Sequence, residues 1–185
     1  MTIDEQIRRL GGVARFADLD ASRHQLKQLV SLGVLVQPAR GCYALPDAPT
    51  ALIAAVRANA TLSCVSAVAL TDPTAPVPSR GVHLSLPPHR GRRARTGPGT
   101  RVHYEHVERV GSSRLATLED AAARAAQCQP YDDAVVVLDH LTHHHGPDFL
   151  ERVLRAVSVS RPSRALALRA DVDGRTRSPT ETRVR

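Results

Sequence analysis

The stretch SRHQLKQLVSLGVLVQPARGCYAL, residues 22–45, decides how the start of this chain folds. Its first half has apolar residues at helical spacing, namely Leu26, Leu29, Val30 and Leu32. This spacing predicts a helix with Asp20 or Ser22 as its N-cap and Gly33 at its end. The second half, VLVQPARGCYAL, predicts two short strands about a turn at residues 38–41, which together make a wing.

Two more short helical pieces are predicted before this stretch. The segment IDEQIRRL, residues 3–10, places Ile3, Ile7 and Leu10 on one helical face, and a double glycine stops it. The segment VARFADL, residues 13–19, has a second apolar periodicity. Three short helices followed by a hairpin is the order of a winged helix-turn-helix, whose helix fits the major groove of DNA.

The polar face of the helix predicted in residues 22–32 supplies candidate DNA contacts. Arginine and lysine can pair with guanine and glutamine with adenine, although a polar outer face also suits any surface helix. At the wing tip, Arg40 could reach phosphate or the minor groove, or it could be a solvated turn residue. The candidate contacts on the helix are Ser22, Arg23, His24, Gln25, Lys27 and Gln28.

The rest of the chain predicts a second domain, so that the fold class is α+β and mainly helical. We expect the winged helix-turn-helix in residues 1–46, an α+β domain in 49–157 and an irregular basic tail in 158–185. Within the second domain an alanine-rich helical stretch breaks near residues 59–61, and VHLSL and RVHYEHV alternate like half-buried strands. In the tail, SRALALRA could form a helix.

A basic stretch without any acidic residue separates these two strands. Its arginines suit a flexible loop that follows DNA phosphates, a surface for an acidic partner protein, or a solvated hairpin loop. An isolated winged helix-turn-helix binds weakly without a dimer or a second contact surface, which favours the role in DNA binding. The residues concerned are Arg90, Arg92, Arg93 and Arg95.

Composition narrows the class of protein further. The formal net charge of +7 favours a polyanionic partner, most simply nucleic acid. The three cysteines are far apart and include no C-x-x-C pair, so we expect neither a disulfide framework nor a cysteine-rich zinc site. There is no apolar signal core and no apolar run of transmembrane length, so we expect a cytoplasmic protein without a membrane partner.

A group of histidines raises metal binding as an alternative. His140 with His143 or His144 could bind zinc from one helix face, but a histidine-rich helix end before Gly-Pro is the more ordinary interpretation. The residues that could complete a tetrahedral set are Asp139, Asp148 and Glu151. We therefore expect no metal site and no cofactor. Because no catalytic constellation is present either, the chain is not expected to be an enzyme.

The order of these motifs resembles the actinobacterial AbiEi-like antitoxins of type IV toxin–antitoxin systems. RLGGVA at 9–14 is similar to the family's opening RLGGVATRAEL, and RGCYALP at 40–46 is similar to its wing RGVYALP. Cys42 stands where the family carries Val, and Cys64 stands where it carries His. Shorter matches along the chain are LSCVSA at 62–67, VHLS at 82–85, TLED at 117–120 and VVLD at 136–139.

The resemblance implies a sequence-specific binder of double-stranded DNA. Such an antitoxin would repress its own operon and counter a nucleotidyltransferase-type toxin. The segments DGR at 173–175 and SPTETR at 178–183 are similar to a junction that, in many relatives, leads into a nuclease domain like that of very-short-patch-repair endonucleases. Two alternatives follow: the DNA-targeting portion of a nuclease whose catalytic domain is missing, or a protein-interaction module.

Overall fold

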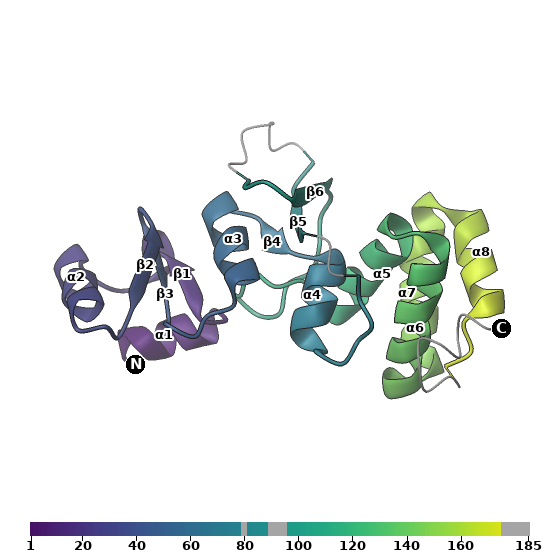
Figure 1. Ribbon diagram of the computed structural model, residues 1–185, viewed down its shortest axis with the longest axis horizontal. Coiled ribbons are helices and arrows are strands. Elements are labelled where there is room, and N and C mark those ends of the chain that lie inside the picture. Colours follow the sequence, from purple (N-terminus) through teal and green to yellow (C-terminus); the bar gives the residue numbers. More distant parts are fainter. Residues whose placement is uncertain (79–80, 89–95, 175–185) are drawn as a thin grey trace. The chain divides into compact units, whose positions relative to one another are not determined.

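A computed structural model describes residues 1–78, 81–88 and 96–174 of the chain (Figure 1). These residues form eight α-helices and two three-stranded sheets, a mixed α+β fold that is mainly helical, as predicted. The chain divides into two units: Met1–Leu62 with Leu84–Ala116, and Ser63–His83 with the residues from Thr117 onward. The domain bounds expected at residues 46–49 and 157–158 stay a prediction. None of the helices in the described part of the chain is long and apolar enough to cross a membrane.

The first unit begins with α1 (Ile3–Arg9), which confirms the helix predicted from the sequence. Thr2 caps it, because the Thr2 side chain accepts a hydrogen bond from Glu5 N while the Glu5 carboxylate accepts one from Thr2 N. The helix ends where Gly11 and Gly12 both adopt a φ of +87°, a conformation that favours glycine.

The helical piece predicted at residues 13–19 is wrong. Val13–Arg15 forms strand β1, and Phe16–Asp18 forms one turn of 3-10 helix, η1. β1 pairs antiparallel with β3 (Cys42–Ala44), and Val13 lies opposite Ala44. A short apolar run is compatible with either structure, and here the distant strand partner decides between them.

The helix and hairpin of the opening stretch are confirmed. Helix α2 (Arg23–Ser31) starts after Ser22, and strand β2 (Val36–Ala39) turns into β3. Gly41 takes a φ of +70° at that turn, where a side chain would be strained. The sheet order is β1-β3-β2. Helices α1 and α2 and the sheet enclose a core. It is made of Ile7, Ala14, Leu26, Leu35, Tyr43 and Leu45.

The middle of the chain contains the second sheet. The predicted break in the alanine-rich stretch is confirmed: α3 (Thr50–Ala58) and α4 (Cys64–Thr71) are separate helices. The two residues of β4 (Thr61–Leu62) between them were not predicted. β5 (Val82–Leu86) and β6 (Thr100–Tyr104) confirm the two alternating strands, and the sheet order is β4-β5-β6.

Four helices make up most of the second unit, drawn in green to yellow in Figure 1. They are α5 (Leu118–Cys128), α6 (Tyr131–His145), α7 (Pro147–Ser160) and α8 (Pro162–Asp171). The buried side of α5 is formed by alanines, so its neighbours α6 and α7 pack closely against it. The largest fully buried side chains of this unit are Phe149, Leu138, Leu141, Leu154 and Leu168.

The helix that SRALALRA could form, inside the tail predicted from residue 158, is confirmed by α8. Helix α7 continues to Ser160, and α8 follows at once and packs against α7. The reason is apolar spacing: Ala165, Leu168 and Val172 are buried. The SPTETR segment, within residues 175–185, lies outside the described residues.

Candidate functional site

The polar face of α2 lies at the surface of the first unit. Leu26 is fully buried and anchors the helix, whereas the polar residues predicted to contact DNA are all exposed. The helix contains no acidic residue, and Arg23 and Lys27 give its exposed face positive charge. The exposed side chains are Arg23, His24, Gln25, Lys27 and Gln28.

Two of the predicted contacts also hold the start of the helix. Ser22 N donates to Gln25 Oε1 at 2.8 Å, and Gln25 N donates to Ser22 Oγ at 3.2 Å. This reciprocal cap satisfies two backbone donors that would otherwise lack partners. The Arg23 guanidinium lies 5.4 Å from the centre of the Phe16 ring, so a cation–π contact with η1 orients it.

The hairpin places Arg40 in the turn between β2 and β3, where it is exposed. The second basic element predicted from the sequence, formed by Arg90, Arg92, Arg93 and Arg95, lies outside the described residues. Its contribution therefore stays a prediction. The described candidate surface consists of the α2 face and the hairpin turn.

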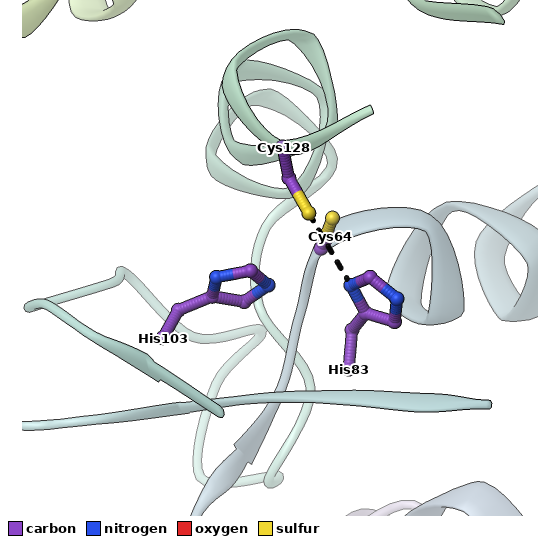
Figure 2. Close-up of side chains that lie close together, drawn as sticks. All are labelled: Cys64, His83, His103 and Cys128. Carbon is purple, nitrogen blue, oxygen red and sulfur yellow. Dashed lines mark hydrogen bonds between the residues drawn. The ribbon is translucent and has the colours of Figure 1, made fainter. Parts of the chain in front are cut away.

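A group of cysteines and histidines was missed by the sequence analysis. Cys64 begins α4, His83 lies on β5, His103 lies on β6 and Cys128 ends α5. Taking one possible ligand atom from each residue, all four atoms lie within 4.8 Å of one another. Figure 2 shows the two sulfurs and the two imidazole rings turned toward a common centre.

Short polar contacts link the members of this Cys/His group. Cys128 Sγ lies 3.8 Å from His83 Nδ1, and Gln129 Nε2 donates to Cys128 Sγ at 3.5 Å and to Cys64 Sγ at 3.8 Å. Cys64 and His83 are buried. The hydrogen bond with Cys128, followed by burial, raises the pKa of the Cys64 thiol. Both effects favour the protonated thiol as long as no cation is bound.

The backbone around Cys64 is tightly held and unusual. Cys64 has a φ of +54°, in the left-handed region that residues other than glycine rarely adopt. Next to it, Ser63 N donates to His83 O at 3.0 Å. His83 N donates in turn to Ser66 Oγ at 2.9 Å, so the start of α4 is fastened to β5 on both sides of Cys64. Backbone strain of this kind clusters at functional sites.

The sequence contains one signal that could have found this group. Each of the two predicted strands carries one histidine near its start, His83 in VHLSL and His103 in RVHYEHV. Neighbouring strands can bring such residues together. The cysteines gave no signal, because recognisable zinc motifs have cysteines in closely spaced pairs.

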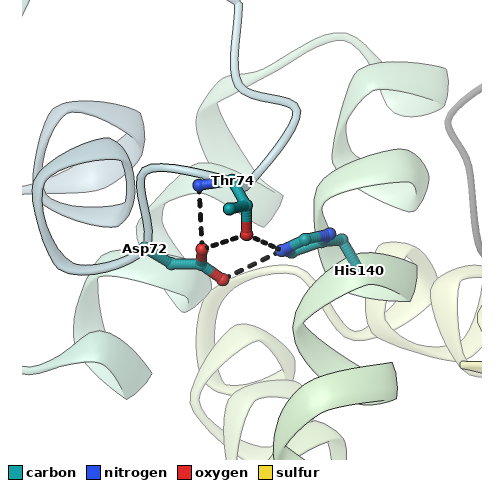
Figure 3. A network of polar contacts seen from close by, with 3 residues as sticks. All are labelled: Asp72, Thr74 and His140. Carbon is teal, nitrogen blue, oxygen red and sulfur yellow. Dashed lines mark hydrogen bonds and ion pairs between the residues drawn. The ribbon is translucent and has the colours of Figure 1, made fainter.

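The histidine considered for metal binding on α6 has another partner. His140 Nε2 lies 2.9 Å from Asp72 Oδ2, and Thr74 Oγ1 donates to Asp72 Oδ1 at 2.6 Å (Figure 3). His143 Nδ1 lies 3.0 Å from Gly174 O instead of beside the same carboxylate. His140 thus fastens α6 to the loop that follows α4.

This contact predicts a pH-dependent stability. Burial raises the pKa of Asp72, but hydrogen bonds from Thr74 and His140 outweigh it and lower that pKa to about 2. Because the folded pKa is below the unfolded one, the carboxylate stabilises the fold above about pH 4, and this contribution disappears as the pH falls toward 2. Asp72→Asn should therefore cost about 1–2 kcal/mol at neutral pH and almost nothing near pH 2. Urea unfolding of both proteins across this range measures the difference, and an equal loss at every pH would contradict the assignment.

Comparisons with known proteins add little to this geometry. No protein-family model matches the chain, and no curated protein matches it. Among solved structures, the RV2827C protein from Mycobacterium tuberculosis matches at 17% identity and a TM-score of 0.38, covering 91% of this chain and 79% of that chain. A likeness at this TM-score says nothing about the function of this chain.

Proposed function

We propose that this chain is a cytoplasmic, sequence-specific binder of double-stranded DNA that acts as a transcriptional repressor. The order α1, β1, η1, α2 and the β2–β3 hairpin supports assigning the N-terminal segment as a winged helix-turn-helix. In this assignment α2 is the recognition helix and the hairpin is the wing. The net charge of +7 is consistent with a polyanionic partner.

The observation that carries the proposal is the exposed, acid-free face of α2. Arg23 with Lys27, and His24 with Gln28, form two rows four residues apart on this face. A helix of about 10–12 Å diameter fits the major groove, which is about 12 Å wide. Lysine, arginine and glutamine are side chains that read base edges there. Arg40, exposed at the hairpin turn, can then contact the flanking backbone.

Binding of fluorescently labelled duplexes at two salt concentrations, about 50 and 200 mM, tests the proposal. One duplex carries the DNA upstream of the chain's own reading frame, and the control is a shuffled duplex of equal length and composition. We expect tighter binding to the upstream DNA at both concentrations, with both affinities falling as salt rises. Equal affinities would contradict specific repression, and no binding to either duplex would contradict DNA binding altogether.

We extend the proposal to an autoregulated antitoxin on the motif resemblance. The partner would be a nucleotidyltransferase-type toxin, neutralised by the second unit. In cells whose growth is arrested by expression of a nucleotidyltransferase encoded beside this chain, co-expression of the chain should restore growth. The double variant Lys27→Ala/Arg40→Ala should restore growth equally, because neutralisation would not use the DNA-binding face. Growth arrest in the presence of the wild-type chain would contradict the antitoxin role and leave DNA binding untouched.

A further inference from the structure

We propose that Cys64, His83, His103 and Cys128 bind one Zn²⁺ ion as a structural Cys2His2 site. Two thiolates and two imidazoles are a ligand set that structural zinc sites use. A tetrahedral arrangement of two sulfur and two nitrogen ligands also favours zinc over magnesium or calcium, which prefer oxygen. This proposal does not rest on the proposed DNA binding.

The distances fit a tetrahedral ion after small movements. With bonds of about 2.3 Å to sulfur and 2.0–2.1 Å to nitrogen, the ligand atoms around zinc lie roughly 3.3–3.8 Å apart. Cys128 Sγ and His83 Nδ1 are already 3.8 Å apart, and the widest separation in the group is at most 4.8 Å. Closure therefore needs side-chain shifts of about an ångström or less.

Regular secondary structure positions each ligand. Cys64 is the first residue of α4 and Cys128 the last residue of α5, and His83 lies on β5. His103 is supplied by β6, the neighbour of β5 in the β4-β5-β6 sheet. Four protein ligands close the coordination sphere, which is typical of structural sites and leaves no position for a substrate.

Two features of the fold gain an explanation from a bound ion. The left-handed conformation of Cys64 places a cysteine where glycine would be easier, and coordination would offset this backbone strain. Strand β6 has no fully buried residue, so hydrophobic packing fixes it only weakly. A bond from His103 to the ion would hold β6 beside its neighbour β5, which carries His83.

Zinc content and cobalt substitution test the proposal on the full chain. The protein is purified under reducing conditions, stripped with a chelator and titrated with Zn²⁺, and bound metal is counted by mass spectrometry. We expect one Zn²⁺ per chain and a higher melting temperature after loading. With Co²⁺, which prefers similar ligands, we expect the absorption of a tetrahedral site with thiolate ligands.

Matched variants separate this site from adventitious binding. His103→Ala and Cys128→Ala should each lower zinc affinity at least about 100-fold, because loss of a residue that merely hydrogen-bonds a metal ligand already costs 10–100-fold. His106→Ala, an exposed histidine on the same segment, and Cys42→Ala, a buried cysteine outside the group, should leave affinity unchanged. If the ligand variants fail to fold, the wild-type stoichiometry and cobalt spectrum still decide.

Three results would overturn the proposal. The first is a wild-type chain that takes up no zinc at equimolar concentration. The second is zinc binding that His103→Ala and Cys128→Ala leave intact. The third is a disulfide between Cys64 and Cys128, found by alkylation and mass spectrometry in protein kept under reducing conditions, because a disulfide would consume both thiolate ligands.

Discussion

Replacing Lys27 and Arg40 together with alanine is expected to weaken binding to the upstream duplex by about 10- to 100-fold. Lys27 lies on the exposed face of α2 and Arg40 at the tip of the hairpin, so the double variant removes one cation from each half of the proposed interface. Losing a base contact costs about 1–3 kcal/mol, and losing a phosphate contact lowers the slope of log affinity against log salt by about one. The measurement is a binding titration at several salt concentrations.

A charge-matched control decides whether position or charge matters. Arg155 and Arg161 are exposed arginines of the second unit, at α7 and at the junction of α7 with α8. Arg155→Ala/Arg161→Ala removes the same formal charge and should change affinity less than about threefold, because it leaves the interface intact and alters only the long-range field. Equal losses in the two double variants would mean that DNA does not lie on α2.

Arg164→Ala is expected to destabilise the helical unit by about 2–4 kcal/mol. Arg164 Nε donates to Ala126 O at 2.5 Å and Nη2 donates to Gln129 O at 2.7 Å, so one guanidinium satisfies two carbonyls at the end of α5. The same guanidinium lies 5.5 Å from the centre of the Tyr131 ring. A positive charge at a helix C-terminus is also favourable to the helix dipole.

Arg164→Lys should keep only part of the stability that Arg164→Ala loses. The lysine ammonium group lacks the planar fork that allows arginine to reach both carbonyls. Arg169→Ala is the control on the same helix: its partner Glu151 is 2.7 Å away, but both side chains are about half exposed, so its loss should cost at most about 1 kcal/mol. Urea unfolding followed by circular dichroism compares the variants. An Arg164→Ala loss as small as that of Arg169→Ala would contradict the role given to Arg164.

Much of the secondary structure could be predicted because its signals are local. Ser22 and Gln25 cap α2 within one turn, and Thr117 accepts a hydrogen bond from Asp120 N at the start of α5. The strand β1 could not be predicted in this way, because its conformation depends on pairing with β3, far along the chain. In α8, the apolar spacing that buries Ala165 and Leu168 is local, and SRALALRA already indicated a helix there.

The two candidate sites differ in how well the sequence predicts them, again because one depends on local signals and the other on tertiary structure. The exposed face of α2 follows from helical periodicity alone, so its residues could be predicted before the fold was known. The Cys/His group depends on tertiary structure, since one ligand begins a helix, one ends another and two lie on strands. No local spacing connects Cys64 with Cys128. Metal sites assembled from distant elements leave no compact sequence motif.

Amide hydrogen exchange of the full chain, with and without the upstream duplex, tests the central claim most directly. If DNA lies on the recognition helix and the wing, exchange should slow most in α2 (Arg23–Ser31) and in the hairpin formed by β2 and β3. The shuffled duplex should slow it less at equal concentration. Tight binding to the upstream duplex that leaves exchange in α2 and the hairpin unchanged would contradict the account.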